Sequence, residues 1–146
     1  MSLKIRTALP EDSSAVAPLL AELGYPQQVD TLPERIAQLA DTPTDAVLVA
    51  ELDGRVVGVA CLHVTVFFHL PGAGRARLTA LVVESAYRGA GIGARLLRAA
   101  ETAAGVRGCS ALELTSAAHR EAAHRFYRTA GYEDLPHRFI KHLNTG

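Results

Sequence analysis

The dipeptide Asp53-Gly54 joins two long apolar segments, residues 46–52 and residues 55–68. Both segments are rich in valine, which favours strands, and an Asp-Gly connection supplies the positive backbone angles of a tight type I′ turn. The two segments are therefore predicted to pair as an antiparallel β-hairpin. Because this pair occupies the middle of the chain, a regularly alternating nucleotide-binding fold, in which every strand is followed by a helix, does not fit.

The chain before the hairpin shows one strand pattern and two helix patterns. Residues 3–7 alternate apolar and polar side chains, as a half-buried strand does. Residues 11–24 begin with acids, carry an apolar stripe and end in glycine, which predicts a helix that Pro18 either kinks or delays. Residues 31–34, with the sequence TLPE, have the form of a capping box and open a second helix to about Ala40.

The chain after the hairpin alternates strands and helices. Residues 72–83 are predicted as a loop that enters a strand ending near Val83, and apolar residues at helical spacing then run from Ile92 to about Ala104. The order of elements, β-α-α-β-β-β-α-β-α-β, is typical of a mixed α/β protein, predicted here as a single domain over residues 1–146. Its last elements are predicted as a buried strand at residues 109–115, a helix at residues 119–132 capped by Gly131, and a closing strand at residues 137–143.

The charge of the chain is balanced, since its 15 Lys and Arg residues equal its 15 Asp and Glu residues. This balance gives no indication of a nucleic acid or an anionic membrane as partner, so any anion must be bound by a local feature. Cys61 and Cys109 stand far apart, no Cys or His spacing suits zinc, and no apolar run approaches the ~18 residues of a membrane span. We therefore expect a cytoplasmic protein with free thiols and no metal.

Residues 87–97, with the sequence YRGAGIGARLL, place three glycines between a predicted strand and a predicted helix. A helix N-terminus leaves backbone N–H groups unpaired, and glycines leave these groups uncovered for an anion with several oxygens. Arg88 adds a full positive charge at the rim. The loop lacks the Gly-Lys-Ser/Thr of a P-loop and follows the fourth strand, so neither nucleotide hydrolysis nor dinucleotide binding fits. The alternative is a turn that only connects strand to helix.

The spacing Arg88-x-x-Gly91-x-Gly93 resembles the acyl-CoA pyrophosphate loop of the GNAT superfamily of N-acetyltransferases. The order of elements over nearly the whole chain is also similar to that of the family. The sequences HR-x-x-AHRFY and RFIKHL are similar to a branch of small bacterial acetyltransferases that includes aminoalkylphosphonate N-acetyltransferase. A second family signature, A-x-x-x-Tyr-x-x-x-Gly-Phe/Tyr, is matched by Ala123, Tyr127, Gly131 and Tyr132.

The resemblance implies a GNAT fold, in which helices flank a mixed sheet and the fourth and fifth strands splay apart to admit acetyl-CoA. By position, the backbone at the end of the fourth strand would pair with the pantetheine amides, and the glycine loop would hold the pyrophosphate without a metal. The residues to which the resemblance assigns contacts with acetyl-CoA are Leu81, Val82, Val83, Arg88, Gly89, Ala90, Gly91, Ile92, Gly93 and, where the family often has Asn, Arg120.

Tyr127 matches the family's general acid, which protonates the CoA thiolate after an amine has attacked the acetyl group. A phenol suits this task because it is protonated at neutral pH, and the alternative is an aromatic side chain of the core. Thr79 and Ala80 stand where relatives tend to carry a Glu or Asp base. His63, whose imidazole suits proton transfer near neutral pH, and Glu113 are candidates for the base that also fit structural roles.

The acceptor is expected to be an amine on a small molecule, a peptide or a protein. Phe67 and Phe68 fit an apolar acceptor pocket, and Arg75 and Arg77 fit an acidic group, with core or dimer contacts and solvated charges as alternatives. Homodimers are common in the family, so a homodimer is a further expectation. Two other functions stay open. One is an inactive sensor or accessory protein that binds acyl-CoA, and the other is an acyltransferase for longer chains or alcohols.

Overall fold

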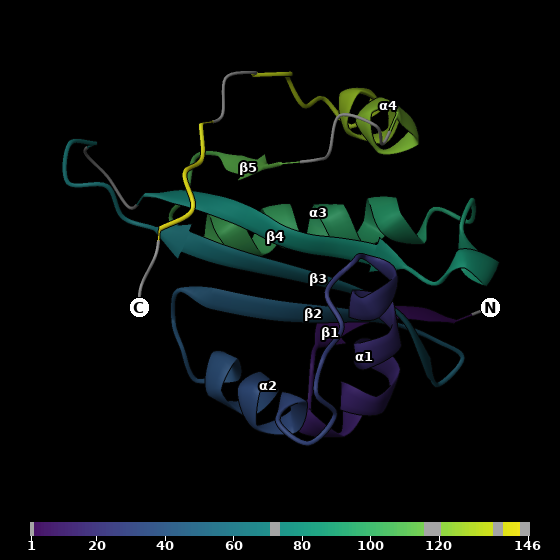
Figure 1. Ribbon diagram of the computed structural model, residues 1–146. Helices are drawn as coiled ribbons and strands as arrows, with labels where there is room; N and C mark the ends of the chain where they lie inside the picture. Colours follow the sequence, from purple (N-terminus) through teal and green to yellow (C-terminus); the bar gives the residue numbers. More distant parts are fainter. Residues whose placement is uncertain (1, 71–73, 116–120, 136–138, 144–146) are drawn as a thin grey trace. The chain divides into compact units, whose positions relative to one another are not determined.

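The computed structural model describes residues 2–70, 74–115, 121–135 and 139–143. The chain divides into two compact units, Met1–Thr115 and Ser116–Gly146, and a single domain stays a prediction. In the first unit, helices lie on both faces of a sheet (Figure 1). The α-helices and strands of the first unit are β1 (Leu3–Thr7), α1 (Ser13–Glu22), α2 (Leu32–Ala40), β2 (Asp45–Leu52), β3 (Arg55–Thr65), β4 (Arg75–Val83), α3 (Ile92–Val106) and β5 (Leu112–Leu114). The second unit contains α4 (Glu121–Thr129).

The sheet follows the chain in the order β1-β2-β3-β4-β5. Its first four strands are antiparallel, and β5 joins β4 in the parallel direction. The predicted hairpin is confirmed, because Leu52 pairs with Arg55 and the two residues between them, Asp53 and Gly54, have φ angles of 50° and 85°. These are the positive angles of a type I′ turn. The mixed sheet agrees with the predicted α/β class.

Two strands are shorter than the sequence predicts. β3 ends at Thr65 and not at residue 68, because the chain turns after it, with the Leu70 N–H donating to the Phe67 carbonyl oxygen at 3.1 Å. Phe68 beyond this point is fully exposed. The buried strand predicted at residues 109–115 is reduced to the half-buried Leu112–Leu114, for which the described chain supplies one partner strand, β4.

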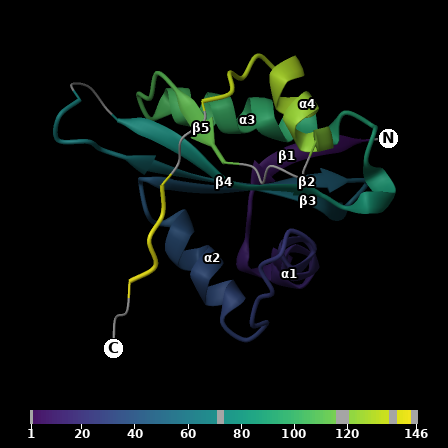
Figure 2. The same ribbon diagram turned by 45° about the horizontal axis from the view of Figure 1, so that its top comes forward.

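The helices cover the two faces of the sheet unequally, with α1 and α2 on one face and α3 on the other (Figure 2). On the α3 face, Leu96 is fully buried against β3 at Gly58, where a Cβ atom would lie 2.8 Å from Leu96 Cδ1. The core on the opposite face combines residues of both helices with residues of the sheet: Val16, Leu32, Ile36, Val47, Val49, Val59 and Val82.

The starts of α1 and α2 differ from the sequence patterns. A 3₁₀ turn, η1 (Pro10–Asp12), precedes α1, which then runs through Pro18 without interruption, so the proline does not delay the helix. The capping box predicted at residues 31–34 is wrong. The Thr31 hydroxyl donates to the Gln28 carbonyl oxygen at 3.3 Å and caps no N–H of α2, because the preceding turn brings that carbonyl within reach.

The second unit confirms one prediction and corrects another. Gly131, with φ at 95°, caps α4 as expected: the N–H groups of Gly131 and Tyr132 donate to the carbonyl oxygens of Arg128 and Tyr127, each at 3.0 Å. The closing strand is wrong for residues 139–143, which form no strand in the structure. Alternating side chains make a strand only where a neighbouring strand supplies hydrogen bonds. Residues 137–138 lie outside the described residues.

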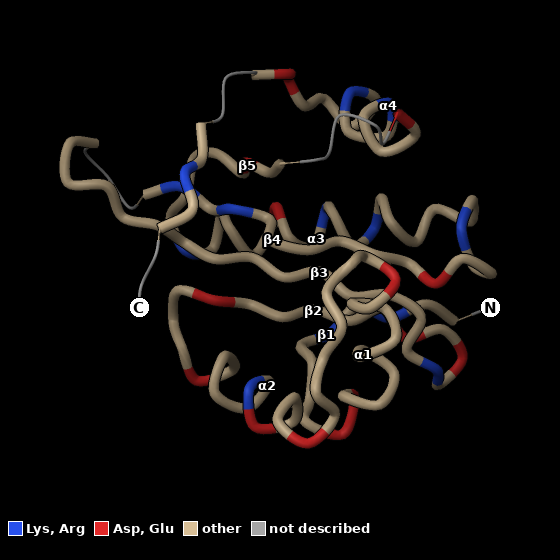
Figure 3. The backbone as a smooth tube through the Cα atoms, in the orientation of Figure 1, with Lys and Arg blue, Asp and Glu red and all other residues tan. Residues whose placement is uncertain are grey.

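Acidic and basic residues are interspersed along the described chain (Figure 3). Among the described residues, no helix is long and apolar enough to cross a membrane. The same residues contain no group of three His, Cys, Asp or Glu side chains arranged to hold a metal ion. Cys61 and Cys109 are free thiols.

An ion pair ties β1 to the turn before α1. The Arg6 guanidinium holds the Asp12 carboxylate through two hydrogen bonds, Nη1–Oδ2 at 2.8 Å and Nη2–Oδ1 at 2.9 Å. The carboxylate also accepts the Leu9 N–H at 2.7 Å, and only 10% of the Asp12 side chain is exposed. The hydrogen bonds from Arg6 keep the pKa of Asp12 below its ordinary value, although burial opposes them.

We expect Asp12→Asn to lower the free energy of unfolding by about 2 kcal/mol at pH 7, since it removes charged hydrogen bonds from a buried site. Because the pKa of Asp12 is lowered in the folded state, its contribution to stability is present above the ordinary Asp pKa of about 3.9 and is lost as pH falls through the folded-state pKa. Urea denaturation of both proteins at pH 7 and at lower pH measures this. A stability difference that does not shrink with falling pH contradicts the assignment.

Candidate active site

The β4 strand continues beyond its pairing with β5. Residues 76–78 of β4 pair with Leu112–Leu114, whereas β4 itself ends at Val83. Within the described chain, residues 79–83 have β3 as their only partner strand. This separation agrees with the splayed fourth and fifth strands that the sequence predicts. As far as the described residues extend, one side of β4 is therefore open to a ligand.

The direction of the backbone groups along this open edge follows from one hydrogen bond. The Glu84 N–H donates to the Val57 carbonyl oxygen at 2.8 Å and therefore points towards β3. Because backbone groups alternate in direction along a strand, those of Val82 also face β3, whereas those of Val83 and Leu81 face the open side. The Val83 carbonyl oxygen accepts a hydrogen bond from Arg88 Nε at 3.1 Å on that side.

A bulge interrupts β4 at Thr79. Cys61 pairs with Ala80 and Leu62 pairs with Leu78, so Thr79 is an extra residue between the two pairs. Its hydroxyl donates to the Cys61 carbonyl oxygen at 3.3 Å. Thr79 and Ala80 both line a cavity on the α1 and α2 face of the sheet. Neither side chain is able to take a proton from an amine at neutral pH.

The glycine loop, residues 88–93, joins a short 3₁₀ turn, η2 (Ser85–Tyr87), to α3. Gly89 and Gly91 have φ angles of 84° and 81°, and a Cβ atom at either position would meet no atom within 4 Å. The backbone angle, and not the available space, therefore requires these glycines. No described residue accepts a hydrogen bond from the N–H of Gly89, Ala90 or Gly91, so these groups are open to an anion at the start of α3.

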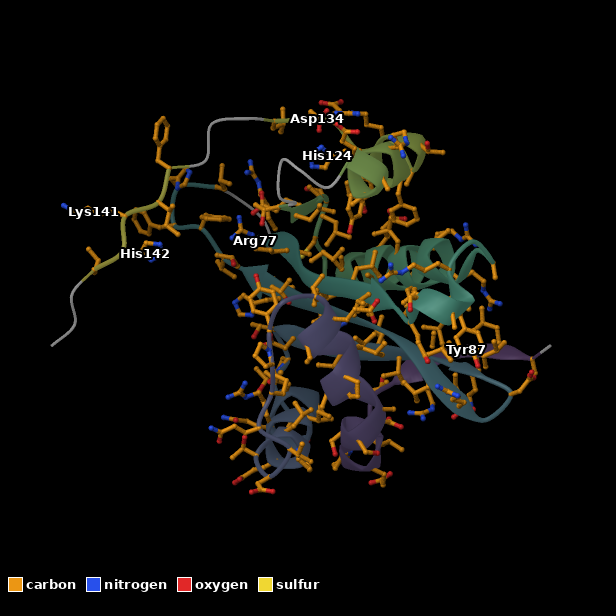
Figure 4. All side chains as sticks on the ribbon, turned by 45° about the vertical axis from the view of Figure 1, so that its right-hand side comes forward. Arg77, Tyr87, His124, Asp134, Lys141 and His142 are labelled. Carbon is orange, nitrogen blue, oxygen red and sulfur yellow. The ribbon has the colours of Figure 1, made fainter. Side chains whose placement is uncertain are left out.

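Arg88 makes two contacts within the protein, and its expected role beside a bound anion stays a prediction. Its Nη2 lies 2.6 Å from Glu22 Oε1 of α1, and its Nε binds the Val83 carbonyl oxygen. The Glu22 carboxylate offsets the charge of the guanidinium. Arg88 therefore braces the glycine loop against α1 and β4. Tyr87, directly before it, lies beside Arg55, whose guanidinium carbon is 5.7 Å from the ring centre (Figure 4).

A cavity of about 250 Å³ lies between the sheet and helices α1 and α2. Cys61, Thr79 and Ala80 line it from the sheet, and Arg35 of α2 is the one charged residue among its described lining residues. Burial, and to a smaller extent the negative charge of Asp45, raises the pKa of the Cys61 thiol to about 11. The thiol is therefore protonated at neutral pH, and the cavity presents a positive charge on an otherwise largely apolar surface.

A row of four ionisable side chains crosses the sheet beside this cavity. In register, Asp45 of β2 pairs with His63 of β3, His63 with Arg77 of β4, and Arg77 with Glu113 of β5. Asp45 Oδ1 lies 3.0 Å from His63 Nδ1, and Glu113 Oε1 lies 3.7 Å from Arg77 Nε. Arg77, which lies on β4, is labelled in Figure 4. The two predicted candidates for the base, His63 and Glu113, thus belong to one row, whereas Asp45 was not predicted from the sequence.

The aromatic and basic residues after β3 do not build the cavity. None of Phe67, Phe68, Arg75 and Arg77 is among its described lining residues. An acceptor pocket formed by these residues stays a prediction. The Arg75 guanidinium carbon lies 5.9 Å from the centre of the Phe67 ring, and Arg77 faces Glu113. Arg35, which does line the cavity, was not predicted from the sequence, because its place there depends on how α2 packs on the sheet.

Tyr127 belongs to the second unit of the chain, on α4. Its ring is half-buried and makes edge contacts with Phe126 and Tyr132, at centroid distances of 5.1 Å and 5.8 Å. The role of Tyr127 as an acid stays a prediction. Arg120 lies outside the described residues.

Known proteins resemble this chain over nearly its whole length. The model of the Acetyltransferase (GNAT) family matches residues 14–132. The chain belongs to the GNAT acetyltransferase family. The aminoalkylphosphonate N-acetyltransferase of Salmonella typhimurium LT2 is 36% identical over 144 residues, which cover 96% of this chain and 91% of that protein.

Two solved structures share the fold of this GNAT protein. A GNAT family acetyltransferase of Staphylococcus aureus USA300_TCH1516 has a TM-score of 0.79 at 24% identity, over 98% of this chain and 100% of that one. An aminoglycoside N-acetyltransferase in complex with CoA has a TM-score of 0.84 at 16% identity, over 99% of this chain and 96% of that one. The family and the relative from Salmonella establish that this chain is an N-acetyltransferase. GNAT acetyltransferases use acetyl-CoA as the acetyl donor.

Proposed function

We propose that this GNAT enzyme transfers the acetyl group of acetyl-CoA to a primary amine, which attacks the thioester carbonyl directly. The main support for an acetyl-CoA site is that the open edge of β4 leads directly into the glycine loop, whose N–H groups are not hydrogen-bonded to described residues. Leu81 and Val83 face the open edge and would bind the pantetheine amides. The N–H groups of residues 89–93 would bind the pyrophosphate oxygens, aided by the partial positive charge at the start of α3.

The other residues of the family pattern take supporting roles in this proposal. Val82 turns its backbone towards β3 and would position its neighbours, and Arg88 would hold the loop in the conformation that the pyrophosphate needs. Arg120 is proposed as a contact to the donor from the family pattern alone. Tyr127 would protonate the CoA thiolate as the C–S bond breaks, since a phenol is protonated at neutral pH.

The acceptor that fits best is a small primary amine with an acidic group. The relative from Salmonella is an aminoalkylphosphonate N-acetyltransferase, and an aminoalkylphosphonate combines an amine with an anion. Arg35 gives the cavity of this chain a positive charge in an apolar setting. A guanidinium there would bind a phosphonate or carboxylate and leave the amine free to approach the acetyl group.

The test is calorimetric binding of acetyl-CoA, followed by release of free thiol with a panel of aminoalkylphosphonates, amino acids, polyamines, aminoglycosides and peptides. Turnover on any of these amines supports the enzyme. Binding of acetyl-CoA without turnover favours a sensor or accessory protein, to which the absence of an acid at Thr79 and Ala80 also points. Failure to bind acetyl-CoA contradicts the donor site.

We expect Arg35→Gln to raise KM at least about tenfold for amines that carry a phosphonate or carboxylate, because one charged hydrogen-bonded contact is lost. For an amine of the same length that carries no acidic group, KM and kcat are expected to stay unchanged. This amine serves as the control within the same variant. Steady-state kinetics on matched pairs of amines measure this. An equal change in KM for amines with and without an acidic group would show that Arg35 stabilises α2 and does not bind the acidic group.

A further inference from the structure

The acceptor cavity has no base of its own among its described lining residues. It contains no Asp, Glu or His side chain, and Thr79 and Ala80 occupy the sheet positions where a base was expected. The Cys61 thiol, with its pKa raised by burial to about 11, keeps its proton at neutral pH. A primary amine is itself protonated at this pH and must lose a proton before it attacks a carbonyl carbon. A base must therefore reach the amine from beside the cavity.

His63 and Asp45 lie directly beside the cavity on the sheet. Residues two apart on a strand share one face and lie about 7 Å apart. His63 is two residues from Cys61 on β3, and Asp45 is two residues from Val47 on β2; Cys61 and Val47 both line the cavity. His63 and Asp45 therefore extend the floor of the cavity along the same face.

The contact between the two side chains prepares His63 to accept a proton. Asp45 Oδ1 lies 3.0 Å from His63 Nδ1, and the Thr44 hydroxyl donates to Asp45 Oδ2 at 3.0 Å. Only 16% of the Asp45 side chain is exposed, compared with 48% of the His63 side chain. A carboxylate at Nδ1 favours the tautomer that carries its proton there and leaves Nε2 free as a base.

We propose that His63 is the general base of the acetyl transfer and that Asp45 is its positioning residue. This proposal rests on the proposed function. The ammonium group of the acceptor gives one proton to His63 Nε2, and the neutral amine then attacks the acetyl carbonyl carbon. The new C–N bond forms and the C–S bond breaks, and Tyr127 gives its proton to the CoA thiolate. The attacking nitrogen then loses its second proton, which restores the proton of Tyr127. The imidazolium of His63 returns its proton to solvent.

The charged and titratable groups that face His63 come from each neighbouring element. Asp45 lies on β2 and Arg77 on β4, and Glu113 on β5 faces Arg77. Cys61 lies on the same face of β3, and Arg35 on α2 lines the adjoining cavity.

The experiment compares kcat/KM of the wild type and His63→Gln across pH with an amine that the wild type acetylates. At pH 7 the variant is expected to be about 100-fold slower, as for loss of a general base. Because the variant depends on amine that is already neutral, its deficit should shrink below about fivefold near pH 9.5, where far more of the amine is neutral. Asp45→Asn should show a smaller deficit with the same recovery, and His69→Gln, in the loop after β3, should match the wild type.

The outcomes separate this proposal from the proposed function. A wild type that turns over an amine, together with a His63→Gln deficit that is absent or equal at both pH values, overturns the role of His63 and leaves the enzyme standing. A wild type without turnover on any amine overturns both. Thermal melting and acetyl-CoA affinity of each variant report on folding, and if His63→Gln does not fold, the pH dependence of Asp45→Asn decides the question.

Discussion

Replacing Tyr127 by phenylalanine is expected to lower kcat for acetyl transfer at least about 100-fold, because the CoA thiolate then leaves without a proton donor. The affinity for acetyl-CoA is expected to stay within about twofold, since only an oxygen atom is removed. The phenylalanine ring keeps the shape that packs at 5.1 Å from Phe126 and 5.8 Å from Tyr132. Thiol release measures kcat, and calorimetry measures the dissociation constant.

Tyr132→Phe is the matched control for this variant. It removes the corresponding hydroxyl from the neighbouring ring, at a position where the family signature accepts phenylalanine or tyrosine. The kcat of Tyr132→Phe is therefore expected to be unchanged. Normal turnover by Tyr127→Phe would show that another group, or water, protonates the thiolate. A parallel loss in both variants would point to the packing of α4.

Replacing Gly91 by valine is expected to weaken acetyl-CoA binding about 30-fold. Gly91 has a φ angle of 81°, which a β-branched residue adopts only under strain of about 2 kcal/mol, and this energy corresponds to the stated loss of affinity. A loop that escapes the strain moves its N–H groups away from the pyrophosphate. Calorimetric titration with acetyl-CoA and with CoA measures the effect.

Gly105→Ala is the control for the glycine loop. Gly105 lies inside α3, where a Cβ atom would meet nothing within 4 Å, so alanine there is expected to stabilise the helix slightly and leave the affinity unchanged. If Gly91→Val binds acetyl-CoA as tightly as the wild type, the loop does not hold the pyrophosphate.

Features that depend on neighbouring residues were predictable from the sequence. The Asp53-Gly54 turn and the Gly131 cap each require positive φ angles within a few residues, and both are confirmed. The capping box at Thr31 failed because a local competitor, the Gln28 carbonyl, took the hydroxyl. Residues 139–143 failed as a strand because pairing depends on a partner that the alternation of side chains does not identify.

The row beside the cavity depends on bulges, which the strand patterns do not reveal. Counting back from the turn, where Leu52 pairs with Arg55, a regular hairpin would place Asp45 opposite Leu62. The register shifts by one residue between Glu51 and Ala50, and Asp45 therefore pairs with His63. The second bulge, at Thr79, likewise sets which residues of β4 reach the cavity. Both candidates for the base were visible in the sequence, but their partners were not.

Gly58 has a consequence for how the donor site can vary. Its missing side chain lets Leu96 lie against β3, since a Cβ atom there would come within 2.8 Å of Leu96 Cδ1 and 3.3 Å of the Val82 carbonyl oxygen. Leu96 belongs to the same helix whose first residues close the glycine loop. The depth at which α3 rests on the sheet therefore sets the height of the loop relative to β4. A larger side chain at position 58 would therefore shift the glycine loop relative to β4 without changing any residue of the loop.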